Sequence, residues 1–92
     1  MIKALVHFEK DFIGIATDDL KKGEEIEAVF MDTNKKVILK TLENIPLGHK
    51  IALTDMKKGV NVIEYGEIIG QATKDIKKGE HVHVHNIKSL RW

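Results

Sequence analysis

The sequence predicts an all-β fold, a small roll or barrel of short strands, from three observations. Apolar residues alternate with other residues at period two through most of the chain, beginning with Ile2, Ala4, Val6 and Phe8. Gly, Asn and Asp separate these runs at short intervals, as turn residues do. No stretch keeps the 3.6-residue apolar spacing of a helix over the roughly ten positions that a stable helix needs.

The expected strands follow one another along the chain at residues 2–8, 12–17, 25–31, 36–40, 50–54, 60–65, 68–73 and 80–87. The first of them reads as a half-buried strand that pairs inside the fold. A single turn of helix is expected over 41–45, with Thr41 as its N-cap and Pro46 ending it. The length favours one domain spanning 1–92.

An internal repeat joins two distant segments, GIATDDLKKGEEI at 14–26 and GQATKDIKKGEHV at 70–82, with a partial third copy at 54–62. We interpret the copies as similar entries into strands. The run Leu20–Gly23 fits a type I turn that ends on glycine, with the Asp19 carboxylate accepting N–H groups of that turn. Gly23, Gly79 and the glycine of the third copy, Gly59, are expected to have positive φ.

The composition argues against several classes of protein. Fifteen basic and fourteen acidic residues leave a net charge of +1, with one arginine and 5% aromatic residues. Such a chain lacks the cationic excess and the stacking residues of a nucleic-acid binder. No apolar run approaches the ~20 residues that span a membrane. The absence of cysteine excludes disulfides and thiolate sites, and we expect a cytoplasmic protein.

Three histidines, His81, His83 and His85, alternate with two valines. On a strand these rings would share one face, while Val82 and Val84 would enter the core. Neighbouring imidazoles at this spacing can reach one metal ion, and His83 and His85 are the favoured ligands, ahead of His81. The alternative is a polar strand face that holds three ordinary histidines.

Two further groups of residues could contact a ligand. Asn86, Lys88 and Arg91 follow the histidines, and their donors suit an anionic, hydroxylated small molecule. The corner made by Pro46 and Gly48 would aim His49 and Lys50 in a defined direction. The last residues could instead be a frayed tail, although Trp92, with Ile87 and Leu90, suits an anchor for a partner chain.

The segments IPLGHKIAL at 45–53 and IEYGEIIGQATKDIKKGEHVHVHNIKSLRW at 63–92 together resemble a known family. They are similar to the small SAF-type domains of the altronate and galactarate dehydratase and sulfolactate sulfo-lyase family. The combination of the HVHN ending with PLGHK is the specific part of this resemblance. It implies a β-clip fold, in which short strands form a compact SAF-like roll.

The resemblance also implies a reaction, the β-elimination of hydroxide or sulfite from a small hydroxy-acid anion. It implies that a divalent metal cofactor, typically Fe²⁺, or else fixed Lys, Arg and His donors, holds the negative charge of the intermediate. His83, His85 and Asn86 match the family's HVHN motif and His49 matches its GHK motif, so we expect the three histidines to be catalytic. We expect the substrate-binding set to be Lys50, Asn86, Lys88 and Arg91.

The family's larger catalytic region has no counterpart in this sequence. We therefore expect a small lyase subunit that works with a large catalytic subunit and is inactive alone. Two alternatives stay open. One is a non-catalytic SAF-type module that binds a saccharide or a protein, and the other is a metal-storage or sensor protein.

Overall fold

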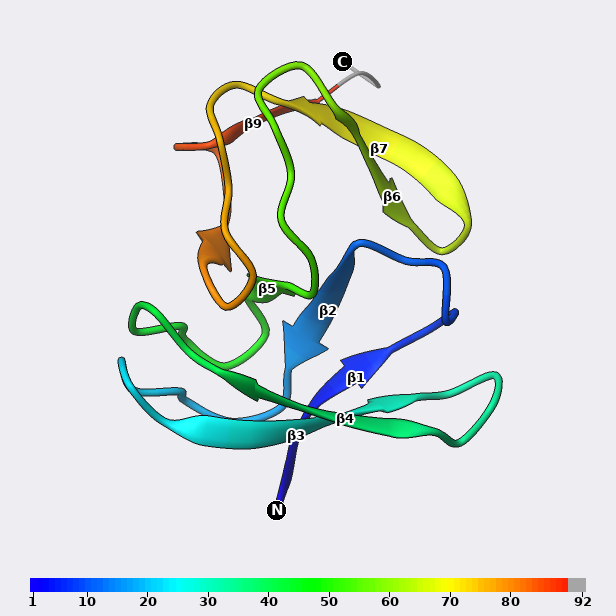
Figure 1. The fold of residues 1–92 in the computed structure, drawn as a ribbon, viewed down its shortest axis with the longest axis vertical. Coiled ribbons are helices and arrows are strands. Elements are labelled where there is room, and N and C mark those ends of the chain that lie inside the picture. The colour runs from blue at the N-terminus through cyan, green and yellow to red at the C-terminus, as the bar shows by residue number, and fades with distance from the viewer. Residues whose placement is uncertain (90–92) are drawn as a thin grey trace.

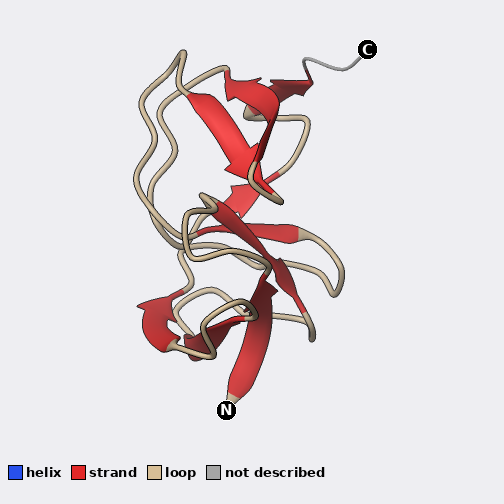
Figure 2. Ribbon diagram, turned by 90° about the vertical axis from the view of Figure 1, so that its right-hand side faces the viewer, coloured by secondary structure: helices blue, strands red, loops and turns tan. Residues whose placement is uncertain are grey.

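The computed structural model describes residues 1–89, in which strands, turns and bends occur and no helix is present (Figure 2). The all-β prediction is confirmed. No helix within this range is long and apolar enough to cross a membrane. The strands, labelled in Figure 1, are β1 (Ile2–Val6), β2 (Ile13–Ala16), β3 (Glu25–Phe30), β4 (Lys36–Lys40), β5 (Lys50–Ala52), β6 (Asn61–Glu64), β7 (Glu67–Ala72), β8 (His81–Val82) and β9 (Ile87–Ser89).

The strands form two sheets. The larger has six strands in the order β4-β3-β1-β2-β5-β8, and it curls through the lower half of Figure 1. The smaller has three strands in the order β6-β7-β9 and lies in the upper part of that view. Neighbouring strands are antiparallel, except that β1 runs parallel to β3.

Two apolar clusters share strands of the larger sheet. One contains Ile51 of β5 together with residues of β1, β3 and β4, and the other contains the next residue, Ala52, together with Val62 and Val82. Successive side chains of a strand point to opposite faces, so β5 supplies one residue to each cluster. Strand β5 therefore connects the two apolar clusters of the fold.

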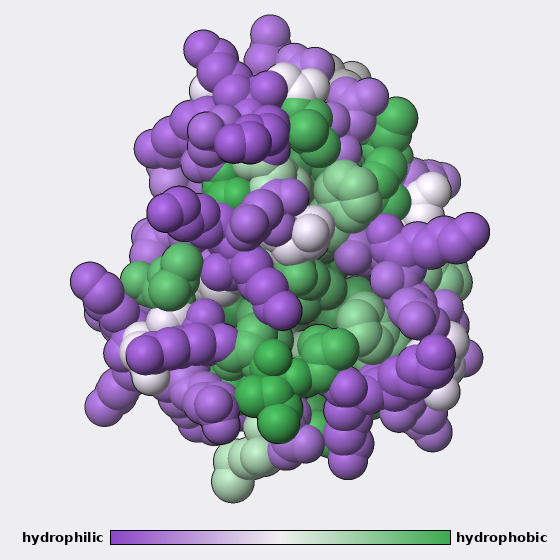
Figure 3. Space-filling model, in the orientation of Figure 1, coloured by the Kyte–Doolittle hydropathy of each residue, from purple (hydrophilic) through white to green (hydrophobic). Residues whose placement is uncertain are grey.

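Hydrophilic side chains surround a group of hydrophobic ones on the face drawn in Figure 3. The green side chains gather over the six-stranded sheet in the lower half of that view. Exposed apolar side chains in the described part of the chain include Ile38, Leu47 and Val84.

The repeats pair with one another across the fold. Met56 and Ile76 form an isolated antiparallel bridge between the copies at 54–62 and 70–82. The Asp55 carboxylate accepts the N–H of Lys78 at 2.8 Å, and the Asp75 carboxylate accepts the N–H of Lys58 at the same distance. Each aspartate therefore caps the turn of its partner copy rather than its own.

The remaining copy, at 14–26, pairs with a fourth, divergent copy at 44–48, which was not among those predicted. Leu20 bridges Ile45, and the Asn44 side-chain oxygen accepts the N–H of Lys22 at 2.8 Å. In return, the Asp19 carboxylate accepts the N–H of Leu47 at 2.9 Å. Asn replaces Asp and Pro-Leu replaces Lys-Lys in the fourth copy, which hides it in the sequence.

One feature of the predicted turns is confirmed and another changes. Positive φ is confirmed at Gly23, Gly59 and Gly79, with values of 84°, 92° and 93°. The first turn, however, closes by the bond from the Glu24 N–H to the Lys21 oxygen at 3.0 Å, so that Gly23 is its third residue. Positive φ at the third position is typical of a type II turn, not the expected type I.

The helical turn expected over 41–45 is wrong. Thr41 is buried, and its backbone pairs with Glu24, while its side-chain hydroxyl contacts the backbone of the first turn. Pairing with a distant copy therefore satisfies the backbone groups that a helix would have used.

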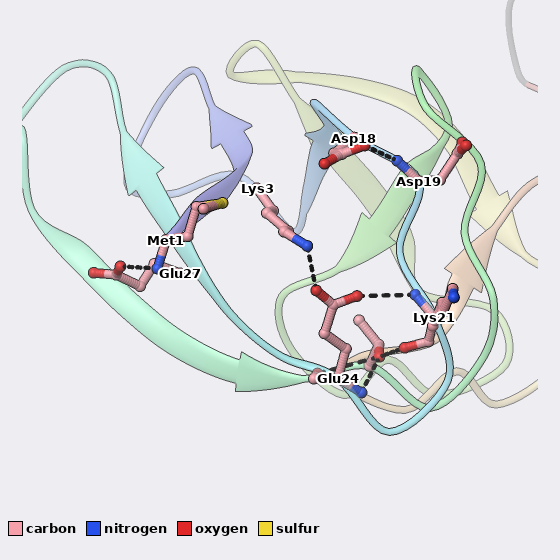
Figure 4. A network of polar contacts seen from close by, with 8 residues as sticks. Met1, Lys3, Asp18, Asp19, Lys21, Glu24 and Glu27 are labelled. Atoms are coloured by element: carbon pink, nitrogen blue, oxygen red, sulfur yellow. Dashed lines mark hydrogen bonds and ion pairs between the residues drawn. The ribbon is translucent and has the colours of Figure 1, made fainter.

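A polar network fixes the N-terminal strand against the first repeat (Figure 4). The Lys3 ammonium contacts the Glu24 carboxylate, whose other oxygen accepts the Lys21 N–H at 3.0 Å. The terminal amine of Met1 contacts Glu27 at 2.6 Å. The predicted first strand is confirmed over Ile2–Val6, where it lies between β2 and β3.

Candidate functional site

A groove of ≈ 660 Å³ lies where the turn before β5, the β6–β7 hairpin and the loop after β8 meet. This volume falls within the roughly 300–1,000 Å³ range of small-molecule sites. Its lining mixes imidazoles and charged groups with apolar side chains, and consists of Gly48, His49, Lys50, Glu64, Tyr65, Glu67, Ile69, Val82, His83, Val84, Ile87 and Ser89.

His49 reaches the groove from the position directly after the fourth repeat copy. Gly48 has a φ of 83°, which lets the chain turn sharply, and the His49 N–H then donates to the Pro46 oxygen at 3.0 Å. The His49 carbonyl accepts the N–H of Ala16 at 2.8 Å. The expected corner therefore exists. Hydrogen bonds to both the N–H and the carbonyl of His49 fix its backbone there.

The predicted strand over 80–87 is wrong. Strand β8 ends at Val82, and the N–H groups of Asn86 and Ile87 both donate to the His83 carbonyl, at 3.0 and 3.1 Å. The chain turns at this point and resumes as β9 in the other sheet. Val82 is buried as predicted, but Val84 is 81% exposed instead of entering the core.

Asn86 explains why the strand stops. Its side chain is buried, and its Oδ1 accepts the His83 N–H at 2.9 Å while its Nδ2 donates to the His81 carbonyl at 2.8 Å. The amide thus holds the backbone of two histidines from inside the turn. Asn86 acts here as a positioning residue, with both polar ends of its side chain already engaged.

The turn nevertheless gathers the histidine rings. The centroid of His49 lies 5.1 Å from that of His81 and 5.0 Å from that of His83. One nitrogen from each of these three rings lies within 4.8 Å of the others, and we call this group the histidine cluster. His85 lies beside it, with its centroid 5.3 Å from that of His81, but does not belong to the set.

Burial lowers the pKa of His81 below its usual value, and the positive charges that its imidazole neighbours can carry lower it further. Both effects favour the neutral ring, which keeps an unprotonated nitrogen. The His81 Nε2 lies 2.9 Å from the His49 Nδ1, so one of these nitrogens donates and the other accepts.

A charged pair lies beside the cluster. The Lys50 ammonium contacts the Glu64 carboxylate at 2.6 Å, and the Glu64 side chain is only 4% exposed. The second carboxylate oxygen of Glu64 is buried without a hydrogen-bond partner among the described residues. Glu64 was not predicted from the sequence, although a glutamate at an inward-facing position of β6, two residues after buried Val62, is a signal of such a site.

The other residues that were expected to contact a ligand or a partner do not all gather at the groove, and some of them lie outside the described residues. Lys88 is exposed on β9, between Ile87 and Ser89, which line the groove, so the alternation of the strand turns Lys88 away from it. Ile87 packs against the second apolar cluster. Arg91, Leu90 and Trp92 lie outside the described residues, and their expected roles stay predictions.

The sequence matches, over residues 2–90, the family described as the altronate/galactarate dehydratase SAF domain. The chain belongs to this family, as the resemblance implied. It is 35% identical to the (2R)-sulfolactate sulfo-lyase subunit alpha of Chromohalobacter salexigens over 92 residues, which are 99% of this chain and 98% of that protein.

Two further relatives show how the domain is used. The subunit alpha of (2R)-sulfolactate sulfo-lyase from Paracoccus pantotrophus is 44% identical over 64 residues, 70% of this chain and 96% of that protein. The altronate dehydratase of Escherichia coli is 43% identical over 79 residues, 86% of this chain but 15% of that enzyme. The family thus includes both small subunits and much longer dehydratases.

Proposed function

We propose that this chain is the small subunit of a two-chain lyase that removes a β-substituent from a hydroxy-acid anion. One observation carries the proposal: the match extends over 98% of a protein named as a lyase subunit. The histidine cluster and the Lys50–Glu64 pair, gathered at one groove, supply groups suited to that chemistry. The cytoplasm stays the predicted compartment.

A large catalytic subunit is the proposed partner. The sulfo-lyase relatives are named as subunits, and the longer dehydratase extends far beyond the matched segment. The groove of this chain opens at the surface beside Val84, which is 81% exposed. A second chain that closes over this rim would exclude water from the reaction.

The proposed reaction has three steps. A base takes the proton from the carbon next to the carboxylate, the leaving group departs with the electron pair of its bond to the β-carbon, and the resulting enol becomes a 2-keto acid. The imidazoles of His49 and His83 line the groove and can take and return protons as long as no metal ion occupies their free nitrogens. We propose that the Lys50 ammonium, which contacts Glu64 beside the groove, binds the carboxylate of the substrate. Catalysis by His85 and substrate contact by Lys88 and Arg91 stay predictions.

The divalent cation that the resemblance implies, Fe²⁺, also belongs to this proposal. Bound near the substrate, it would offset the negative charge that builds up on the carboxylate during proton removal. Imidazole nitrogens are ligands that suit iron, and the histidine cluster offers three of them.

The proposal is tested by purifying the chain alone and together with a large chain that co-purifies with it. Sulfite release is measured with (2R)-sulfolactate, and 2-keto acid formation is measured with altronate and galactarate. We expect turnover of one of these substrates by the pair and none by the small chain alone. Turnover by the isolated chain would contradict the subunit assignment. Saccharide binding by a pair that turns over none of the substrates would favour the binding-module alternative.

A further inference from the structure

We propose that this chain by itself binds one divalent transition-metal ion through His49, His81 and His83. The sequence favoured His83 and His85 as ligands, since it placed both on one strand. The folded chain instead brings His49 to the two other rings from a segment 32 residues earlier than His81. The proposal concerns a site of the small chain and does not depend on the lyase activity.

The distances between the rings suit a shared ion. Two nitrogens that each lie about 2.1 Å from one ion are about 3.0 Å apart at a right angle and about 3.4 Å apart in a tetrahedron. The His49 Nδ1 and His81 Nε2 are 2.9 Å apart. One nitrogen of each of the three rings lies within 4.8 Å of the others, and His83 is exposed, so rotation of its side chain can complete the set.

The protonation of the rings also suits a metal. Imidazole binds a metal through an unprotonated nitrogen, and the bond between His49 and His81 requires one such nitrogen already. An ion would replace the proton that these two rings share. The nearest lysine on the same segment, Lys50, does not repel the ion with an uncompensated charge, because Glu64 neutralises it at 2.6 Å.

The backbone around the cluster is fixed before any ion arrives. The Asn86 side chain holds the carbonyl of His81 and the N–H of His83, and the turn through Gly48 holds His49. Such supporting bonds orient the ligand rings and raise the affinity of a site. Three histidines leave at least one coordination position open, and His49 and His83 both line the groove, where a carboxylate could occupy that position.

The ligand set predicts which ions bind. Neutral imidazoles suit Zn²⁺, Fe²⁺ and Co²⁺, whereas Mg²⁺ and Ca²⁺ require oxygen ligands. We therefore expect Co²⁺ and Zn²⁺ to bind the isolated chain at one ion per chain, and a large excess of Ca²⁺ not to displace them.

The test is titration of the isolated chain with Co²⁺, followed by the visible absorption of the bound ion, and with Zn²⁺, followed by NMR of the histidine rings. His49→Ala, His81→Ala and His83→Ala should each lower the Co²⁺ affinity about 100-fold or more, since even the loss of an outer-shell partner costs roughly 10–100-fold. His85→Ala and His7→Ala are the matched controls and should bind as the unchanged chain does.

The NMR measurement needs no substitution, so it stands if a variant fails to fold. Zn²⁺ should shift the ring signals of His49, His81 and His83 and leave those of His7 unchanged. Failure of the unchanged chain to bind one Co²⁺, or an equal loss of affinity in His85→Ala, would overturn the proposed site. Neither result would bear on whether the paired chains are a lyase.

Discussion

At the scale of single residues, the glycines of the repeat turns differ in what surrounds them. Gly23 and Gly79 both have positive φ, and a Cβ added at Gly23 would meet no atom within 4 Å. A Cβ added at Gly79 would lie 2.2 Å from the backbone oxygen of Lys40. Gly79 therefore has a second constraint, the close passage of β4.

Gly79→Ala should consequently destabilise the domain more than the matched variant Gly23→Ala. The φ alone costs about 1 kcal/mol, and forcing β4 away adds about 1–3 kcal/mol of packing strain. Urea unfolding of both variants measures their free energies of unfolding and tests this prediction. An equal decrease in the two variants would show that β4 moves aside without an energetic cost.

The Lys50–Glu64 pair makes a second residue-scale prediction. Lys50→Met leaves the buried Glu64 carboxylate without its partner and should cost about 1–3 kcal/mol of stability. Replacing both, as Lys50→Met with Glu64→Met, removes the buried charge as well and should recover most of that loss. Unfolding free energies of the single and double variants measure the effect, and additive losses would contradict it.

At the scale of elements, the contact between β1 and the first repeat turn depends on pH. The pKa of Glu24 lies below its usual value, chiefly because its carboxylate accepts a hydrogen bond from the Lys3 ammonium. The contact therefore contributes its full stability above the usual glutamate pKa and loses it as the pH falls through the lowered value.

Lys3→Met should raise the Glu24 pKa toward its usual value, as an NMR titration of the side-chain carboxyl will show. The matched control is Lys35→Met, because Lys35 pairs with exposed Glu9 and not with Glu24. An unchanged Glu24 titration in Lys3→Met would mean that the turn N–H of Lys21 alone sets its pKa.

The turn after β8 is the element that orients the histidine cluster. Asn86→Ala frees the His81 carbonyl and the His83 N–H, so it should lower both the unfolding free energy, by about 1–3 kcal/mol, and the Co²⁺ affinity, by about 10-fold. Asn61→Ala, which changes an exposed asparagine on β6, should do neither. A loss of stability with unchanged Co²⁺ binding would show that the histidine rings keep their positions without the Asn86 hydrogen bonds.

At the scale of the whole molecule, the rim of the groove is the face that we expect the large subunit to cover. Val84 is 81% exposed there, whereas Ile38, 62% exposed, lies on β4 at the opposite edge of the six-stranded sheet. Val84→Glu should weaken assembly with the large chain at least about 10-fold, the equivalent of ~1.4 kcal/mol, because a carboxylate would lose water in the interface.

Ile38→Glu should leave assembly unchanged, and both variants should keep the stability of the isolated domain, since both side chains are exposed. Sedimentation or calorimetric titration of the two chains measures the affinity. Equal weakening by both variants would place the interface elsewhere.

The sequence by itself determined the local structure. Period-two alternation and turn residues gave the positions of most strands, since these preferences depend on neighbouring residues, and positive φ at the repeat glycines followed from the same reasoning. The motifs PLGHK and HVHN also carried the family resemblance, which the comparison with known proteins confirmed.

Only the tertiary structure decided which segments meet. The fourth repeat copy became visible through its pairing with the first, and this pairing replaced the helical turn expected over 41–45. The buried Asn86 amide ended the histidine strand, and the fold then placed His49 beside His81 and Lys50 against Glu64. The physical reason is that such contacts join residues far apart in the chain, and their free energy depends on burial and on partners that no local pattern encodes.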